Sequence, residues 1–413
     1  MRDDPRRRWD LLGDETVVWK FGGTSVADAA RLRAAAERMI AAQQAGRRVV
    51  AVLSAMGGMT DELVGLSRAV SSRPPPRELD VLLTVGEAMS CALAAMAVDE
   101  LGSRAVSLTG AQAGIRTDDR HGNARLREIL PRRILEELDT GAIVLVTGFQ
   151  GISPRGDVTT LGRGGSDASA VALAAALGLR ECQIFTDVDG VFTADPRVVP
   201  GARRLPAIGR TQMLHLASAG AAVLQPRAVE LAIAHGIDIH VRSSFTGSSG
   251  TWVVEETSMF ETAEVVGVAY RDREPCYAVR GLSPTAITVA LARRGSAVGT
   301  AVRHGDEVLF TTPGMTETEV SAVLGVQVTV QDEFGTVTVV GHGLDRRPEI
   351  TARALLALER DGIDAHLVTS TPGSVSFHIP APRVRAAVGL LHDLFALADA
   401  APVDRPLAGV AGP

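Results

Sequence analysis

Several residue types that many binding and redox proteins depend on are scarce in this sequence. Its 413 residues include three cysteines, and phenylalanine, tryptophan and tyrosine together account for 4%. So few aromatic rings disfavour a protein that stacks single-stranded nucleic acid on aromatic side chains. A formal net charge of -6 also disfavours general nucleic-acid binding, because such proteins are usually basic. We therefore expect no nucleic-acid partner.

The cysteines show no spacing that would favour a metal site or a disulfide framework. Cys91, Cys182 and Cys276 lie far apart among apolar residues. A sparse, odd-numbered set is typical of reduced thiols in a cytoplasmic protein. In apolar surroundings, buried and inert thiols are more common than nucleophilic ones. The sequence thus predicts a cytoplasmic protein with no metal site of its own.

Hydrophobic segments long enough for a membrane are also missing. Residues 1–14 are charged and contain no apolar stretch of the kind that secretory signals carry. The longest apolar runs, such as residues 168–179, fall short of the roughly 20 residues that span a bilayer. We expect neither a signal peptide nor a membrane partner.

Lysine is almost absent. Lysine and arginine total 42, but a single lysine, Lys20, occurs. A GC-rich genome would explain the bias towards arginine, and a lone lysine on the surface can survive by chance. The alternative is that position 20 requires a compact ammonium on a thin stem, which a planar guanidinium cannot replace.

The first 250 residues alternate short apolar strands with helical segments. Strands are expected at residues 16–20, 48–54, 142–147, 182–186 and 237–243, and helices at 26–44, 82–101 and 168–179. Ser25 and Asp28 have the spacing of a capping box. This alternation favours an α/β fold with a mainly parallel sheet between helix layers. We assign residues 15–250 to this domain.

Residues 251–263 look like a linker, and shorter elements follow. Strands are expected at residues 265–270, 275–280, 308–311, 326–331, 336–340, 365–370 and 375–379, with helices at 350–361 and 384–396. This order predicts one or two small α+β units with antiparallel sheets over residues 264–400. The tail from residue 401 is expected to be disordered.

Two glycine-rich segments stand at strand-to-helix junctions, where the backbone can approach an anionic ligand. The first, Gly22-Gly23-Thr24, follows the lone lysine, and the second occupies residues 159–167 before an Ala- and Leu-rich helix. In the second, Arg163 offers a two-point contact to a carboxylate. Asp167 can cap the helix, hold Mg²⁺ or polarise a phosphoryl acceptor. Two tight turns with a capping aspartate are the structural alternative.

Neither segment matches a common nucleotide motif, since G-x-x-x-x-G-K-[ST] and G-x-G-x-x-G are both absent. A third polar cluster, residues 185–197, follows a predicted strand and includes Arg197, which is suited to phosphate. It resembles part of a calcium loop but lacks the closing glutamate. Its Asp-Gly and Asp-Pro pairs are common turn formers. The three segments together indicate a nucleotide enzyme of another design.

Together these segments resemble the aspartokinase family, a branch of the amino-acid-kinase superfamily. The resemblance covers most of residues 16–245 and rests on the following stretches: Lys20-Phe21-Gly22-Gly23-Thr24-Ser25-Val26, Ser54-Ala55-Met56-Gly57, Gly86-Glu87, His121-Gly122-Asn123-Ala124-Arg125, Gly148-Phe149-Gln150-Gly151, residues 159–167 and residues 186–197. Residues 264–400 more weakly resemble tandem ACT regulatory domains. The resemblance implies an amino-acid-kinase fold followed by ACT-like, ferredoxin-like domains, and a homo-oligomer formed through the latter.

The resemblance also implies an activity and residue roles. The activity is transfer of the γ-phosphoryl of ATP, with Mg²⁺, to the side-chain carboxylate of L-aspartate, giving 4-phospho-L-aspartate and ADP. Lys20 and Asp167 would be catalytic, with Lys20 neutralising the moving phosphoryl. Glu87 would take the ammonium group of aspartate and Arg163 a carboxylate, and the whole set of aspartate-binding residues would be Ser54, Thr60, Glu87, Arg163 and Ser166. The nucleotide would be held by Lys20, Gly22, Gly23, Thr24, Thr186, Asp187, Phe192 and Arg197.

The residue types suit this reaction. Phosphoryl transfer depends on alignment and positive charge rather than on covalent help from the protein. A carboxylate is already a nucleophile at neutral pH, so the reaction requires no general base.

The sequence departs from the family pattern in both halves. Ala222 stands where the family commonly has a lysine that contacts the nucleotide, and Phe192 replaces the usual tyrosine. A lost charge-assisted contact costs on the order of 1.5–3 kcal/mol, which Arg197 or Arg227 could offset. Residues 281–285 lack the Pro-Gly start of an effector helix, and Glu349 replaces a glycine. We therefore expect weak or altered feedback control by lysine or threonine.

Two alternatives to an active aspartokinase remain open. One is a kinase of the same fold that acts on another amino acid, which the presence of Thr60, Glu87 and Arg163 disfavours. The other is a catalytically inactive, amino-acid-sensing regulatory protein. Ala222 is consistent with that, but retention of Lys20 is not.

Overall fold

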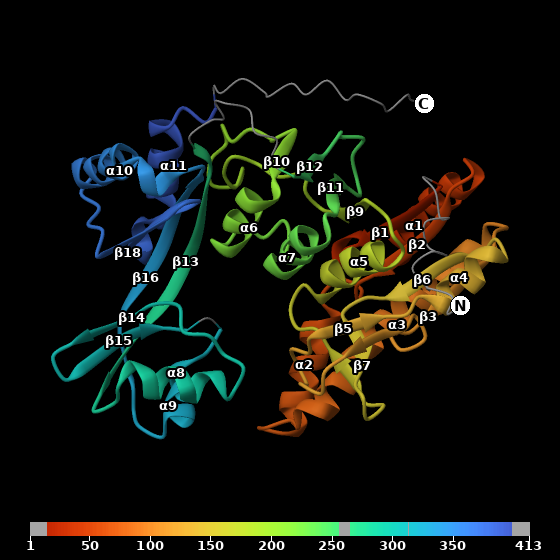
Figure 1. Ribbon diagram of the computed structural model, residues 1–413, viewed down its shortest axis with the longest axis horizontal. Coiled ribbons are helices and arrows are strands. Elements are labelled where there is room, and N and C mark those ends of the chain that lie inside the picture. The colour runs from red at the N-terminus through yellow and green to blue at the C-terminus, as the bar shows by residue number, and fades with distance from the viewer. Residues whose placement is uncertain (1–14, 256–264, 313, 399–413) are drawn as a thin grey trace, which may run out of the picture.

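The N-terminal part of the chain is built on an eight-stranded sheet in this computed structural model, which describes residues 15–255, 265–312 and 314–398 (Figure 1). Hydrogen-bonded neighbours in the sheet are parallel, except for the antiparallel pair β11 and β12. The spatial order is β10 (Ala207–Gly209), β12 (Thr251–Val254), β11 (Asp238–Ser243), β9 (Glu181–Thr186), β1 (Thr16–Phe21), β2 (Arg48–Leu53), β6 (Ile143–Thr147) and β3 (Ala105–Leu108). The predicted mainly parallel sheet is confirmed.

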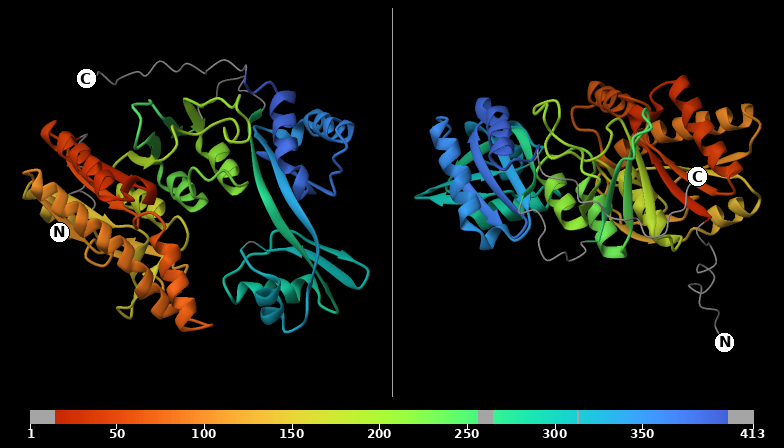
Figure 2. Two further views of the ribbon diagram at one scale, coloured as in Figure 1. Left: turned by 180° about the vertical axis from the view of Figure 1, so that it is seen from behind. Right: turned by 90° about the horizontal axis from the view of Figure 1, so that it is seen from above.

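Helices cover both faces of this sheet. Trp19 and Ala51 share a core with α1 (Ala29–Gln44) and α3 (Pro76–Glu100). Val18 belongs to the core on the other face, which is covered by α4 (Arg132–Asp139), α5 (Gly165–Ala176), α6 (Arg210–Ser218) and α7 (Pro226–His235) (Figure 2). Because side chains alternate between the two faces of a strand, Lys20 projects to the same side as Val18, where α5 lies.

A small four-stranded sheet positions the second glycine-rich segment. Its order is β5 (Leu126–Ile129), β4 (Ile115–Thr117), β7 (Gln150–Ile152) and β8 (Val158–Thr160). Strands β7 and β8 form an antiparallel hairpin in which Gln150 pairs with Thr160. The chain leaves this hairpin directly into the glycine turn and then α5, so the hairpin determines where the turn meets the large sheet.

The C-terminal part contains an antiparallel six-stranded sheet. Its order is β14 (Ala301–His304), β15 (Glu307–Thr311), β13 (Val265–Arg280), β16 (Thr329–Gly341), β18 (Ser374–Pro380) and β17 (Leu367–Thr371). Figure 1 shows the long strands β13 and β16 running between two groups of helices: α8 (Pro284–Ala292) with α9 (Glu317–Leu324), and α10 (Pro348–Arg360) with α11 (Val384–Leu394). This confirms the predicted antiparallel α+β architecture.

Helix α3 is long and apolar enough, by length and composition alone, to cross a membrane. The prediction that apolar runs are too short to do so missed this helix. Cys91, Ala94 and Val98 on its inner face are completely buried against the large sheet. We therefore interpret α3 as a core helix of the N-terminal part.

Several predicted elements differ from the structure. Residues 265–280 and 329–341 each form one long strand, with irregular register between β13 and β16, where the sequence suggested two strands apiece. The start of the predicted linker forms β12, because Thr251–Val254 pairs with both β10 and β11. Asp28 caps α1 by accepting from Arg31 N, so Ser25 takes no part in a capping box. The predicted disordered tail lies outside the described residues.

Candidate active site

The lone lysine forms a largely buried ion pair with the aspartate of the second glycine turn. Lys20 Nζ lies 2.6 Å from Asp167 Oδ1, and the two side chains are 12% and 8% exposed. Lys20 stands near the end of β1, and Asp167 in the first turn of α5. Because charges removed from water persist only when paired, Asp167 holds the ammonium in place. Lys20 is therefore not a surface lysine that was retained by chance.

The first glycine turn passes close to this ammonium. Gly22 N donates a hydrogen bond to Phe185 O, at 3.1 Å, near the end of β9. A Cβ atom on Gly22 would lie 3.4 Å from Lys20 Nζ, and one on Gly23 only 2.9 Å from Ala55 O. The absence of side chains lets the backbone lie against the ends of three strands and the charged group.

The second glycine turn has backbone angles that favour glycine. Gly162 and Gly164 have φ angles of 80° and 68°. Gly164 is the N-cap of α5, and a Cβ atom there would overlap the side chain of Gln225. Asp167 does not cap the helix, which leaves its carboxylate for the ammonium. Arg163 is exposed and makes no hydrogen bond or ion pair with any described residue, so its guanidinium is free for a ligand.

Glu87 is buried beneath the end of β2. Its Oε1 accepts a hydrogen bond from Ala55 N at 3.2 Å, whereas its Oε2 is buried without a partner among the described residues. Burial raises the pKa of Glu87 to about 7, and the Ala55 hydrogen bond opposes that rise. A buried carboxylate oxygen with no partner suits a site that receives an ammonium group from a ligand.

Two serines stand at the same edge of the sheet. Ser54 N donates to Phe21 O, at 3.1 Å, where β1 ends. Ser166 is buried in the first turn of α5, and a Cβ atom on Gly148, just after β6, would lie 2.6 Å from Ser166 Oγ. The carboxyl ends of parallel strands meet at one edge, where ligands of open α/β sheets bind. The predicted residues that gather there are Lys20, Gly22, Gly23, Ser54, Glu87, Ser166 and Asp167.

Two of the predicted threonines, Thr24 and Thr60, lie on the helices that follow β1 and β2. Thr24 is exposed within η2 (Gly23–Val26). Thr60 is half-buried in the first turn of α2 (Met59–Val70). Thr24 stands three residues after β1 ends at Phe21, and Thr60 seven residues after β2 ends at Leu53.

The third polar cluster, residues 185–197, begins at the end of β9, beside β1, and then leads away from β1. Thr186 Oγ1 donates to Asp187 Oδ1, at 3.1 Å, at the end of β9. Arg197 lies further along, where its Nε and Nη2 contact Asp195 at 3.0 and 2.8 Å and hold the pKa of that carboxyl below its usual range. The hydroxyl of Tyr270, on β13, donates to the same carboxylate at 3.2 Å. Arg197 is thus engaged at the junction with the C-terminal sheet.

Arg227 is also committed to the protein. Its Nη1 donates to Leu161 O at 2.6 Å and its Nη2 to Ala124 O at 2.7 Å. Partial burial lowers the pKa of Arg227. Arg227 is therefore not free to replace the family lysine missing at the exposed position 222, and Arg197 would have to leave Asp195 to do so. Phe192 is half-buried, and forms a backbone bridge to Arg204.

Sequence reasoning missed Asp80, a buried residue on α3 with three hydrogen-bonding partners at the second glycine turn. One signal was available: Asp80 lies seven residues before Glu87, which places both carboxylates on one face of a helix.

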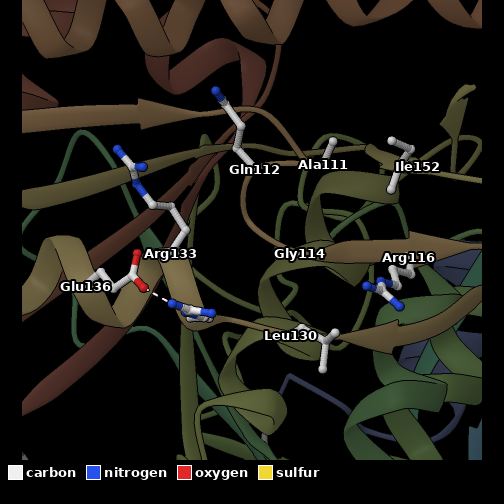
Figure 3. Close-up of a pocket in the computed structure, with 9 residues that line it drawn as sticks. Ala111, Gln112, Gly114, Arg116, Leu130, Arg133, Glu136 and Ile152 are labelled. Atoms are coloured by element: carbon white, nitrogen blue, oxygen red, sulfur yellow. Dashed lines mark hydrogen bonds and ion pairs between the residues drawn. The ribbon is translucent and has the colours of Figure 1, made fainter. Parts of the chain in front are cut away.

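Two hollows in the described surface lie outside the lysine site. One of about 400 Å³ sits over β4 and α4, and is lined by Arg116, Arg132 and Arg133 (Figure 3). These arginines pair with glutamates at 3.5, 2.8 and 2.6 Å respectively, so none is free for an anion. The other, of about 530 Å³, lies between α2 and residues 314–319 at the start of α9.

The parallel sheet, the glycine turns and the lysine at the strand ends define an amino acid kinase. The sequence model of the Amino acid kinase family matches residues 15–243. The chain is 44% identical to an aspartokinase of Geobacillus stearothermophilus, over 93% of this chain and 98% of that protein. It is 43% identical to an aspartokinase of Mycolicibacterium smegmatis, over 92% and 96%. The chain therefore belongs to the aspartokinases.

The structure agrees with this assignment. A crystal structure of E. coli aspartokinase III in complex with aspartate and ADP superimposes with a TM-score of 0.79 and 26% sequence identity. The match covers 92% of this chain and 99% of that one. The likeness extends through the C-terminal sheet, beyond the part that the family model matches.

Proposed function

We propose that this chain transfers the γ-phosphoryl of ATP to the side-chain carboxylate of L-aspartate, forming 4-phospho-L-aspartate and ADP. The observation that carries the proposal is the Lys20–Asp167 ion pair, which sits between two glycine turns at the strand ends. An ammonium held there can neutralise the phosphoryl during transfer, while the glycine backbone lies against the phosphates.

The aspartate side of the site offers one free group for a carboxylate of the acceptor and one for its ammonium group. Arg163 has an unengaged guanidinium for a carboxylate, and Glu87 has an unpartnered oxygen for the α-ammonium group. Ser54, Thr60 and Ser166 supply hydroxyls nearby. Because the acceptor carboxylate is itself the nucleophile, the site needs alignment rather than a general base.

The nucleotide side is assigned to Gly22, Gly23, Thr24, Thr186, Asp187, Phe192 and Arg197. Use of Arg197 would require its guanidinium to exchange Asp195 for phosphate. No group of three or more His, Cys, Asp or Glu among the described residues is arranged to hold a metal. Mg²⁺ usually binds through substrate phosphates and one or two carboxylates, and Asp167 and Asp187 are suitably placed carboxylates. We assign Mg²⁺ to the incoming MgATP complex.

We further propose that residues 15–250 form the catalytic domain and residues 264–400 a pair of ACT-like regulatory units that also mediate homo-oligomer formation in the cytoplasm. Effector control is expected to be weak. Glu349 stands exposed in the first turn of α10, where a glycine would leave the backbone open to a small ligand.

A coupled ADP-release assay with saturating MgATP tests the activity. Aspartate should support ADP release and form a hydroxamate with hydroxylamine, whereas glutamate and other acidic amino acids should not. ADP release with another amino acid but not with aspartate would favour the same-fold alternative. No release with any acceptor would favour an inactive sensing protein.

A further inference from the structure

Asp80 ties helix α3 to the segments on either side of the second glycine turn. Its side chain is almost fully buried, at 1% exposure. Thr160 Oγ1 donates to Asp80 Oδ1 at 2.6 Å, and Gly122 N lies 3.0 and 3.1 Å from its two oxygens. His121 Nδ1 lies 2.8 Å from Oδ2. Because a carboxylate only accepts hydrogen bonds, Nδ1 carries the proton and the histidine tautomer is fixed.

These partners adjoin the turn that carries Arg163. Thr160 ends β8, and the next residue, Leu161, is held from the opposite side by Arg227. The loop at Gly122 packs against the turn itself, since a Cβ atom on Gly162 would lie 3.2 Å from Gly122 O. Asp80 and Arg227 therefore grip the turn from two different helices, α3 and α7.

Helix α3 also carries Glu87, seven residues further along. Two turns of helix set a nearly constant separation of about 10 Å between two residues on one face. Because Asp80 and Glu87 lie on the same helix, the contacts of Asp80 also set the distance between the Arg163 turn and Glu87. These are the two groups assigned to a carboxylate and to the ammonium group of the acceptor amino acid.

We propose that Asp80 is a positioning residue that fixes the spacing between Arg163 and Glu87 and so aligns both groups with the charged groups of the acceptor amino acid. This inference rests on the proposed function. Burying a carboxylate is expensive unless every oxygen is hydrogen-bonded, and an apolar residue would fill the same space under the turn without that cost. The three donors that converge on Asp80 hold the turn in one position, which apolar packing alone would not do.

The main test replaces Asp80→Asn, which keeps the shape but turns one acceptor into a donor facing other donors. KM for aspartate should rise about tenfold or more, because small displacements of a positioning group are costly. KM for ATP should change less than about twofold. Glu137→Gln, a buried carboxylate on α4 that pairs with Arg104 and Arg133, is the matched control and should leave both KM values unchanged.

Two milder variants keep the test informative if Asp80→Asn does not fold. Thr160→Val removes one donor with little change of shape and should raise KM for aspartate selectively. His121→Asn retains an N–H near the position of Nδ1 and should preserve KM better than His121→Ala. Equal rises in KM for aspartate and ATP in the folded variants would overturn the proposal.

A readout without catalysis separates this inference from the proposed function. Limited trypsin digestion reports how often the exposed turn opens for cleavage after Arg163. Cleavage there should be faster in Asp80→Asn than in wild type or Glu137→Gln, and equal rates would contradict a grip on the turn. Failure of the proposed function would instead appear in wild type, as missing aspartate-dependent ADP release.

Discussion

Lys20 Nζ lies 2.6 Å from Asp167 Oδ1, so the single lysine of this chain is fixed by a carboxylate from the first turn of α5. The ion pair joins the end of β1, in the large sheet, to the glycine turn that follows β8, in the small sheet. The geometry leaves space for a compact ammonium between the two turns. A guanidinium is broader and requires a planar arrangement of acceptors.

Lys20→Arg is therefore expected to lower kcat by roughly 100- to 1,000-fold, the usual effect of removing a group that stabilises charge in the transition state. The charge is kept, so this loss would report geometry rather than electrostatics at a distance. Coupled ADP release at saturating aspartate and ATP measures it. Arg132→Lys, on the exposed face of α4, is the control and should be neutral. Retention of a tenth of wild-type kcat in Lys20→Arg would argue against direct contact with the phosphoryl group.

Glu87 should make aspartate binding depend on pH. Its pKa near 7 means that the carboxylate that receives the ammonium group is mostly protonated at pH 6 and mostly ionised at pH 8. KM for aspartate should therefore rise about tenfold as pH falls from 8 to 6. In Glu87→Gln the KM should be high at both pH values. A wild-type KM that is flat across this range would show that Glu87 does not bind the ammonium.

The buried Glu87 carboxylate should also lower the stability of the ligand-free protein. Its folded-state pKa of about 7 exceeds the value of 4.5 for an unperturbed glutamate, so between these pH values the folded state keeps a proton that the unfolded state loses. Stability should fall as pH rises from about 4.5 to 7, by up to about 3 kcal/mol. Glu87→Gln removes this pH dependence. The free energy of unfolding of the variant, relative to that of wild type, should therefore be higher at pH 8 than at pH 5. Urea unfolding followed by tryptophan fluorescence tests it, and a pH-independent difference would contradict burial as the cause.

Ala222→Lys should tighten ATP binding. Position 222 is exposed, and the two arginines that might substitute for the family lysine are held by Asp195, Leu161 and Ala124. A restored charge-assisted contact is worth on the order of 1.5–3 kcal/mol, which corresponds to at least a tenfold lower KM for ATP. KM for aspartate should stay constant. Ala301→Lys, exposed on β14, controls for the added charge, and an equal effect there would refute the local contact.

Feedback inhibition should be weak. Lysine or threonine at millimolar concentration should lower the initial rate by less than about half, because the Glu349 side chain occupies the approach to the start of α10. Glu349→Gly should increase sensitivity to one of the two amino acids. Strong inhibition of the wild-type enzyme by either would contradict this prediction.

Much of the site was recognisable in the sequence because its signals are local. Lys20 with Gly22 and Gly23, and the turn around Arg163, were predicted from residue types at strand ends. Phe192 was assigned by resemblance alone, whereas Arg197 was also chosen as a phosphate-suited residue of the third polar cluster. The contact between Tyr270 and Asp195, the partner of Arg197, could not be predicted, because Tyr270 belongs to β13.

The sequence by itself determined the alternation of strands and helices, the positions of the glycine turns and the retention of one lysine. These follow from side-chain periodicity and from the backbone freedom of glycine, both of which act over a few residues. The tertiary structure alone decided that Asp167 pairs with Lys20 instead of capping α5, that Glu87 is buried with one oxygen unpartnered, and that Asp80 grips the Arg163 turn. Each of these depends on which distant segments pack together, because burial and charge pairing are set by neighbours in space rather than along the chain.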